Sequence, residues 1–259
     1  DVSMSDVQAG LVKAINATPE IAGVVTASAG VSSGEISLRA NEAGTRDSFQ
    51  VNTTLSGTQY EPSTTMLKDG GFVVSWNSDS DIYAQRYDGE GTLVGDEFRV
   101  NSWVSSSQQT PSIASLDDGG FIVTWSDNSG HDGGSSYDIR GRRYDLNGEA
   151  LADEFLVNQS MVSGSQYTPS VSGLKNGGFV VSWRDDSTQG GDSYEVRAQV
   201  FDQKGEATGY SFGVNTHKTD YQDEAEVVAL DDGGFVVTWT SRYQDGSGDG
   251  ALDYPAEFQ

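Results

Sequence analysis

The sequence predicts a mainly β protein, a β-propeller-like array of four repeats of about 50 residues with four strands each, preceded by a small α+β unit. The main observation is a turn followed by a hydrophobic strand, which occurs at Asp69–Trp76, Asp118–Trp125, Asn176–Trp183 and Asp232–Trp239. Asp/Asn-Gly-Gly supplies the positive φ of a tight hairpin turn, and Phe, Val, Ile and Trp favour a strand. A recurrence every 50 residues or so is typical of propeller blades.

Each repeat carries further strand signals in the same order. It begins with Phe-x-Val-Asn, as at Phe49–Asn52, and continues through Gln-x-x-Pro, as at Gln59–Pro62, into the Gly-Gly turn. After each tryptophan comes a loop rich in Asp, Ser and Gly. A strand of alternating apolar and polar residues follows, such as Asp81–Asp88, and an Asp-x-x-Gly turn closes it. The predicted repeats are about 49–97, 98–154, 155–211 and 212–259.

Residues 1–46 lie outside the repeat and predict a unit of their own. Apolar residues at helical spacing predict a helix over 6–16, and Val24–Ala27 and Glu35–Arg39 predict a hairpin. The chain is therefore divided into a helix-plus-hairpin unit, 1–46, and a four-repeat domain, 47–259. Separate small sandwiches or an extended solenoid are the alternatives for the repeats. A propeller ring would have four blades, or be half of an eight-bladed ring completed by a second chain.

The composition excludes several classes of partner and site. The net charge is −24, from 39 acidic and 15 basic residues among 259, and such a surface repels nucleic acid and anionic membranes. The chain has no cysteine, which excludes disulfides and thiolate metal sites. No apolar stretch is long enough to predict membrane insertion. No signal peptide is visible at Asp1, so we expect a processed product or a fragment.

The loops that follow the tryptophans are the candidate metal sites. The best has oxygen-bearing side chains at alternate positions and a glycine for the sharp turn, an arrangement that suits calcium. Its candidate ligands are Asp245, Ser247, Asp249 and Asp253. The corresponding candidates in the second and third repeats are Asp127, Asp132, Asp138, Asp185 and Asp192. The alternative is that these are ordinary solvent-exposed turns, which use the same residue types.

The sequence offers little support for catalysis. It contains two histidines in different loops, and no nucleophile elbow, zinc-binding helix or phosphate loop. We therefore predict no catalytic residue. Four of the five tryptophans stand at equivalent repeat positions, where burial is expected, and Trp103 alone lies outside the pattern. Trp103 is the candidate for an exposed ligand contact.

The combined string resembles a repeat of large secreted bacterial proteins. The string runs from Gln-x-x-Pro-Ser through Leu-x-Asp-Gly-Gly-Phe-Val-Val-Ser/Thr-Trp and Asp-Ile-x-x-x-Arg-Tyr-Asp to Glu-Phe-x-Val-Asn, and it covers about residues 49–259. Proteins with such repeats include RTX-type calcium-binding surface proteins and adhesins. The resemblance implies export without a cleaved N-terminal signal, an extracellular or cell-surface location, and calcium as the cofactor.

These observations favour a non-enzymatic extracellular structural or adhesive module, stabilised by calcium. Its expected partners are further copies of itself or a neighbouring extracellular protein. The alternative is a carbohydrate-binding propeller with sites in the grooves between blades, and a glycan-active enzyme ranks third.

Overall fold

A computed structural model of the chain describes residues 25–29, 36–40, 49–54, 56–131, 136–160, 163–187, 194–216, 221–241 and 256–258. These segments contain 18 strands and no helix. The hairpin predicted near the N-terminus is present, with strands at Val25–Ala29 and Ile36–Ala40. The helix expected over 6–16 lies outside the described residues. No helix that could cross a bilayer occurs in the described segments.

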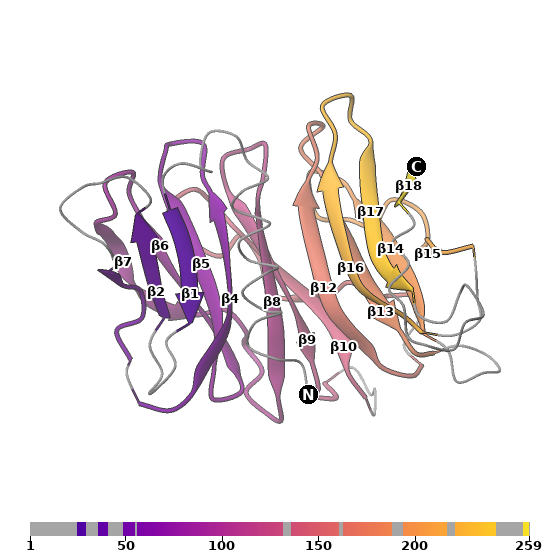
Figure 1. Ribbon diagram of the computed structural model, residues 1–259, viewed down its shortest axis with the longest axis horizontal. Coiled ribbons are helices and arrows are strands. Elements are labelled where there is room, and N and C mark those ends of the chain that lie inside the picture. Colours follow the sequence, from indigo (N-terminus) through magenta and orange to yellow (C-terminus); the bar gives the residue numbers. More distant parts are fainter. Residues whose placement is uncertain are drawn as a thin grey trace.

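The strands form five antiparallel sheets, numbered here 1 to 5 in chain order (Figure 1). Sheet 1 contains β1 (Val25–Ala29), β2 (Ile36–Ala40) and β3 (Phe49–Gln50); sheet 2 contains β4 (Gln59–Met66), β5 (Phe72–Ser78), β6 (Asp81–Tyr87) and β7 (Leu93–Arg99). Sheet 3 contains β8 (Gln108–Ser115), β9 (Phe121–Asp127), β10 (Asp138–Tyr144) and β11 (Phe155–Leu156); sheet 4 contains β12 (Gln166–Gly173), β13 (Phe179–Asp185), β14 (Glu195–Phe201) and β15 (Phe212–Gly213). Sheet 5 contains β16 (Gln222–Ala229), β17 (Phe235–Ser241) and β18 (Ala256–Phe258).

Sheets 2 to 5 follow one another in chain order, and their first strands β4, β8, β12 and β16 contact each other in series. Within a sheet the strands run in sequence from this inner edge outward, the meander order of a propeller blade. The prediction of a mainly β, propeller-like array is therefore confirmed. The described sheets form an open series rather than a closed ring (Figure 1).

The hydrophobic cores lie between neighbouring sheets. One cluster joins sheets 2 and 3, the next joins sheets 3 and 4, and the third joins sheets 4 and 5. In sheets 2 to 5 the second strand is the most deeply buried, and every residue of β5 and of β9 is buried. The repeat tryptophans on these strands are 0–4% exposed, as predicted, at Trp76, Trp125, Trp183 and Trp239.

The two glycines of each Gly-Gly turn have different physical roles. The first adopts a positive φ, +93° at Gly119, a backbone conformation that residues with a Cβ atom disfavour. The second has an ordinary φ but no room: a Cβ at Gly120 would lie 2.2 Å from the carbonyl oxygen of Tyr144. The preceding Asp118 accepts a hydrogen bond from the Gly120 N–H at 3.0 Å, which fixes the turn. The first glycine thus supplies the positive φ expected of the turn, and the second is required by the lack of space.

The structural unit is out of phase with the sequence repeat. We placed the first repeat at 49–97, yet β3 at its start pairs with β2 of sheet 1, and β7, which completes sheet 2, runs to Arg99. The Phe-x-Val segment that opens each repeat is thus the outer strand of the preceding sheet. At the other end, β18 pairs directly with β17 and is the third strand of sheet 5, whereas the matching strands β7, β11 and β15 are the fourth strands of their sheets. A period read from sequence therefore does not fix where the folded unit begins.

Candidate functional site

Three of the aspartates predicted as calcium ligands, Asp127, Asp138 and Asp185, act as internal hydrogen-bond acceptors. Asp127 Oδ1 accepts from Gln108 Nε2 at 2.9 Å, and Asp127 Oδ2 accepts from Arg140 Nε at 2.7 Å. Asp138 Oδ1 accepts from an asparagine of the Phe-x-Val-Asn motif at 2.9 Å. Asp185 Oδ1 accepts from Gln166 Nε2 at 3.0 Å. These carboxylates link the loops to the strands.

The remaining predicted metal ligands cannot be placed. Asp132, Asp192 and the loop from Asp245 to Asp253, which includes Ser247 and Asp249, lie outside the described residues. Within the segments that are described, no group of three or more His, Asp or Glu side chains is arranged to hold a metal ion.

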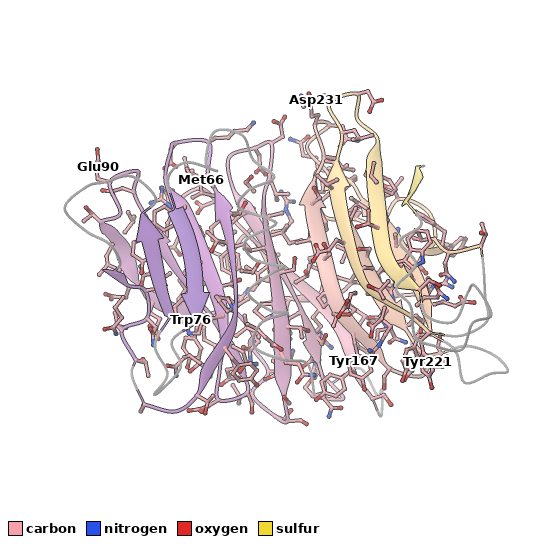
Figure 2. All side chains as sticks on the ribbon, in the orientation of Figure 1. Met66, Trp76, Glu90, Tyr167, Tyr221 and Asp231 are labelled. Carbon is pink, nitrogen blue, oxygen red and sulfur yellow. The ribbon has the colours of Figure 1, made fainter. Side chains whose placement is uncertain are left out.

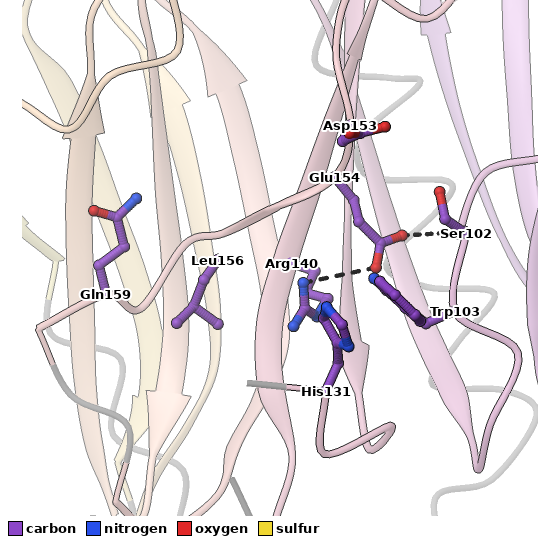
Figure 3. A pocket seen from close by; sticks show the side chains of 8 residues that line it. All are labelled: Ser102, Trp103, His131, Arg140, Asp153, Glu154, Leu156 and Gln159. Atoms are coloured by element: carbon purple, nitrogen blue, oxygen red, sulfur yellow. Dashed lines mark hydrogen bonds and ion pairs between the residues drawn. The ribbon is translucent and has the colours of Figure 1, made fainter. Parts of the chain in front are cut away.

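Trp103 lines a hollow at the outer side of sheet 3 (Figure 3). The hollow measures about 560 Å³ and draws its walls from the β7–β8 connection, the loop after β9, and strands β10 and β11. We call it the Trp103 hollow. Its lining residues are Ser102, Trp103, His131, Arg140, Asp153, Glu154, Leu156 and Gln159.

The Phe-x-Val-Asn motif positions Trp103. Asn101 Nδ2 donates to the carbonyl of Trp103 at 2.8 Å, and Asn101 Oδ1 accepts from the backbone of β6 at 2.7 Å. The motif asparagine therefore ties the connection after β7 to sheet 2. The indole is 41% exposed and stacks on the His131 ring, with ring centroids 3.4 Å apart and planes at 22°. His131 covers one face of the indole, and a large apolar surface remains open to a ligand.

Glu154 forms the buried floor of the hollow. Its Oε2 accepts from the Ser102 N–H at 2.7 Å, and its Oε1 lies 3.6 Å from Arg140 Nη1 (Figure 3). The side chain is 2% exposed, yet Oε1 has no hydrogen-bond partner among the described residues. Burial raises the pKa of the Glu154 carboxyl above its usual value, against the lowering effects of the Ser102 N–H and of Arg140. A buried acceptor without a donor is costly, so this atom favours a ligand that brings one.

The first repeat contains the same carboxylate contact without the rest of the site. Glu97 Oε2 accepts from the Thr53 N–H at 2.7 Å, as Glu154 does from its own neighbour. Thr54 stands at the position of Trp103, and Tyr83 stands at the position of Arg140. The glutamate thus holds the connecting loop in both repeats, and the second repeat adds the aromatic and cationic groups.

The third repeat keeps the arginine and loses the other two groups. Arg197 takes the strand position of the arginine, paired in register with the repeat tryptophan. Ser211 and Ser160 replace the glutamate and the exposed tryptophan, and their hydroxyls bond to each other at 2.6 Å. Of the three repeats whose loops are described here, the second alone joins an exposed tryptophan to a buried Arg–Glu pair.

The sequence analysis selected Trp103 and missed three partners, His131, Arg140 and Glu154. Glu154 belongs to a recurring motif, whereas Arg140 stands at a variable position within one, where the first repeat has Tyr83. An alignment of the repeats would have shown this, because only the second repeat has the tryptophan, the arginine and the glutamate together.

Comparison with known proteins identifies the fold and no family. No protein-family model matches the sequence, and no curated protein matches it either. Among solved structures, an α-L-arabinofuranosidase from Fusarium graminearum, crystallised with an iminosugar inhibitor, matches with a TM-score of 0.59 and 12% identity, over 90% of this chain and 76% of that one. A Dyadobacter fermentans protein of unknown function matches with a TM-score of 0.55 and 14% identity, over 76% and 68%. A Hadza microbial sialidase matches with a TM-score of 0.53 and 12% identity, over 86% and 54%.

These matches correct our expectation of a non-enzymatic structural or adhesive module. The arabinofuranosidase and the sialidase named above are glycoside hydrolases with β-propeller folds. A glycan-active enzyme ranked third in the sequence analysis because the sequence lacks a short catalytic motif, although the paired carboxylates of glycoside hydrolysis need no such motif. At 12% identity the likeness establishes the fold, and the activity of this chain is a separate question.

Proposed function

We propose that this protein acts on glycans and that the Trp103 hollow binds one of their sugar units. The observation that carries the proposal is the meeting of an exposed tryptophan with a buried Arg140–Glu154 pair in one repeat. A sugar ring has a C–H face that packs on an aromatic ring and hydroxyls that donate to a carboxylate. Glu154 Oε1 is buried in the free protein, so a sugar hydroxyl would reach it only after a neighbouring side chain of the hollow moves, and it would then supply the hydrogen bond that this oxygen lacks.

Binding measurements against a panel of oligosaccharides test the proposal. Trp103→Ala should weaken binding about tenfold or more, since it removes the stacking surface. Tyr210→Ala is the matched control, because Tyr210 is an aromatic residue that is 86% exposed and lies outside the hollow. A panel in which no saccharide binds, or in which both variants bind like the wild type, would contradict the proposal.

Hydrolysis of the bound glycan is the activity that one further observation favours. A carboxyl with a raised pKa holds its proton closer to neutral pH and suits the role of general acid. Asp153, next to Glu154, is exposed and lines the same hollow, and glycoside hydrolysis uses two carboxyl groups. Glu154→Gln keeps an acceptor for the Ser102 N–H and removes the acid, so turnover should fall about 100-fold or more. Glu97→Gln, which changes the same contact in the first repeat, should leave turnover intact.

We further propose that additional units of the same repeat complete a propeller ring. The leucine before each Gly-Gly turn is 2–5% exposed at Leu67, Leu116 and Leu174, where the next sheet covers it. Leu230, its counterpart in sheet 5, is 37% exposed, so this sheet presents a face suited to another blade.

Calcium binding and an extracellular location, both implied by the repeat resemblance, belong to the same proposal. Asp127 and Asp185 accept hydrogen bonds from side chains on the strands, so they are less suited to bind calcium. The candidate calcium site is therefore the loop from Asp245 to Asp253, whose acidic residues have the spacing of a calcium-binding loop.

A further inference from the structure

Five tyrosines stand at one end of sheets 2 to 5, and we call them the tyrosine row. Their positions are Tyr60 and Tyr167 at the second residue of β4 and β12, Tyr137 and Tyr194 immediately before β10 and β14, and Tyr221 immediately before β16. In an antiparallel meander the first strand starts where the third strand starts, so all five lie at the same end. Figure 2 shows Tyr167 and Tyr221 at this edge, opposite the edge that holds Asp231.

The row continues from sheet to sheet. The rings of Tyr137 and Tyr167 have centroids 4.8 Å apart, and those of Tyr194 and Tyr221 are 4.9 Å apart. The Arg184 guanidinium bridges the two pairs, 4.6 Å from the Tyr167 centroid and 4.5 Å from the Tyr194 centroid. The contacts therefore link sheets 3, 4 and 5. At sheet 2, Tyr60 stands at the second residue of β4, the position that Tyr167 has in β12.

The row differs from the tyrosines that build the core. Tyr87 and Tyr144 are 1–2% exposed and donate their hydroxyls to the carbonyls of Val51 and Val100. The tyrosines of the row are half-buried, Tyr221 is 37% exposed, and no described residue accepts a hydrogen bond from their hydroxyls. The row thus presents ring faces and hydrogen-bonding groups at the surface, the combination found in binding sites.

The charges around the row favour an uncharged ligand. Arg184 is its cation, and Asp223 Oδ2 already accepts from Arg184 Nη1 at 3.0 Å. Two further carboxylates, Glu61 and Glu224, flank the row on β4 and β16. With a chain charge of −24 in addition, nucleic acids and anionic polysaccharides are repelled.

We propose that the tyrosine row is an extended binding surface for an uncharged linear glycan, several sugar units long, that also reaches the Trp103 hollow. The row and the hollow lie at the same end of the sheets, because His131 and Tyr137 belong to the one loop between β9 and β10. Hydroxyls along such a chain match the tyrosine hydroxyls, and its ring faces match the tyrosine rings. This inference rests on the proposed function and specifies its substrate class as a neutral polymer rather than a single sugar.

The test is the dependence of affinity on chain length, measured by calorimetry with neutral oligosaccharides from two to about six units. Affinity of the wild type should rise with each added unit, by about tenfold over the series. Tyr221→Ala should remove most of this rise and leave the binding of the shortest sugar unchanged. Tyr221→Phe, which keeps the ring, should retain most of it, and Tyr210→Ala should behave as the wild type. Trp103→Ala should weaken every length equally.

The outcomes separate the two proposals. Glycan binding that does not depend on chain length, or that Tyr221→Ala leaves unaltered at every length, would overturn the extended surface and keep the hollow. Tighter binding of a proline-rich peptide than of any glycan would overturn it too, because aromatic surfaces also bind polyproline. Absence of all glycan binding would instead refute the proposed function itself.

Discussion

Replacing the second glycine of a Gly-Gly turn by alanine tests why the Gly-Gly pair recurs. A Cβ at Gly120 would lie 2.2 Å from the Tyr144 carbonyl oxygen, whereas ordinary contact begins at 3.4 Å. The carbonyl must therefore move by roughly 1 Å in a close-packed interior. Tyr144 pairs with Phe121 at the end of the β9–β10 ladder, so the shift disturbs that pairing. We expect Gly120→Ala to cost about 3 kcal/mol, the upper part of the range for overpacking.

The neighbouring glycine is the matched control. Gly119 has a φ of +93° and open space around its Cβ position, so Gly119→Ala should cost only about 1–2 kcal/mol of backbone strain. Asparagine tolerates positive φ, so Gly119→Asn should cost less than Gly119→Ala, whereas Gly120→Asn should cost more than Gly120→Ala. Thermal melts resolve these differences, at about 2–4 °C per kcal/mol for a chain of this size. Equal losses at the two glycines would refute the steric explanation.

Three further predictions concern the core, the buried carboxylate and calcium. Trp125→Ala should cost about 3–5 kcal/mol of unfolding free energy because Trp125 is 0% exposed, whereas Trp103→Ala should cost under about 1 kcal/mol; similar losses in denaturant titrations would disprove the assignment of core and surface. The folded state binds a proton at Glu154 more tightly than the unfolded state does, so the contribution of Glu154 to the unfolding free energy falls as pH rises from about 4. In melts recorded against pH, Glu154→Gln should make this fall less steep. The slope from Glu61, whose pKa burial also raises, should remain, and an unchanged slope would show that Glu154 is not perturbed. Chelator should lower the melting temperature of the wild type and leave that of Asp249→Ala unaltered; a wild type indifferent to chelator would exclude a structural calcium ion.

Local chemistry explains which parts of the fold could be predicted. The turn and strand strings are short-range signals, and they gave the positions of the Gly-Gly turns and of the buried tryptophans correctly. The phase of the sheets depends on which distant strand accepts the Phe-x-Val segment. That choice is made by pairing between residues such as Leu38 and Phe49 of different units, and a repeat period carries no information about it.

The candidate site illustrates the same limit. Residue types in the loops suggested calcium, but Gln108 and Arg140, distant along the chain from Asp127, occupy its two oxygens. Trp103 was identified because it departs from the repeat. Glu154 follows the repeat, and its free Oε1 and its closeness to Arg140 exist only in the folded chain.

Intrinsic fluorescence titrated with neutral oligosaccharides tests the central claim most directly. Of the five tryptophans, four are at most 4% exposed and Trp103 is 41% exposed, so a ligand-induced change reports on the Trp103 hollow. We predict a saturable change in emission on addition of the oligosaccharide, and its loss in Trp103→Phe, which preserves an aromatic ring in the hollow and leaves the buried indoles in place. Emission that stays constant across the whole oligosaccharide panel, or that changes equally in Trp103→Phe, would contradict a sugar-binding role for the hollow.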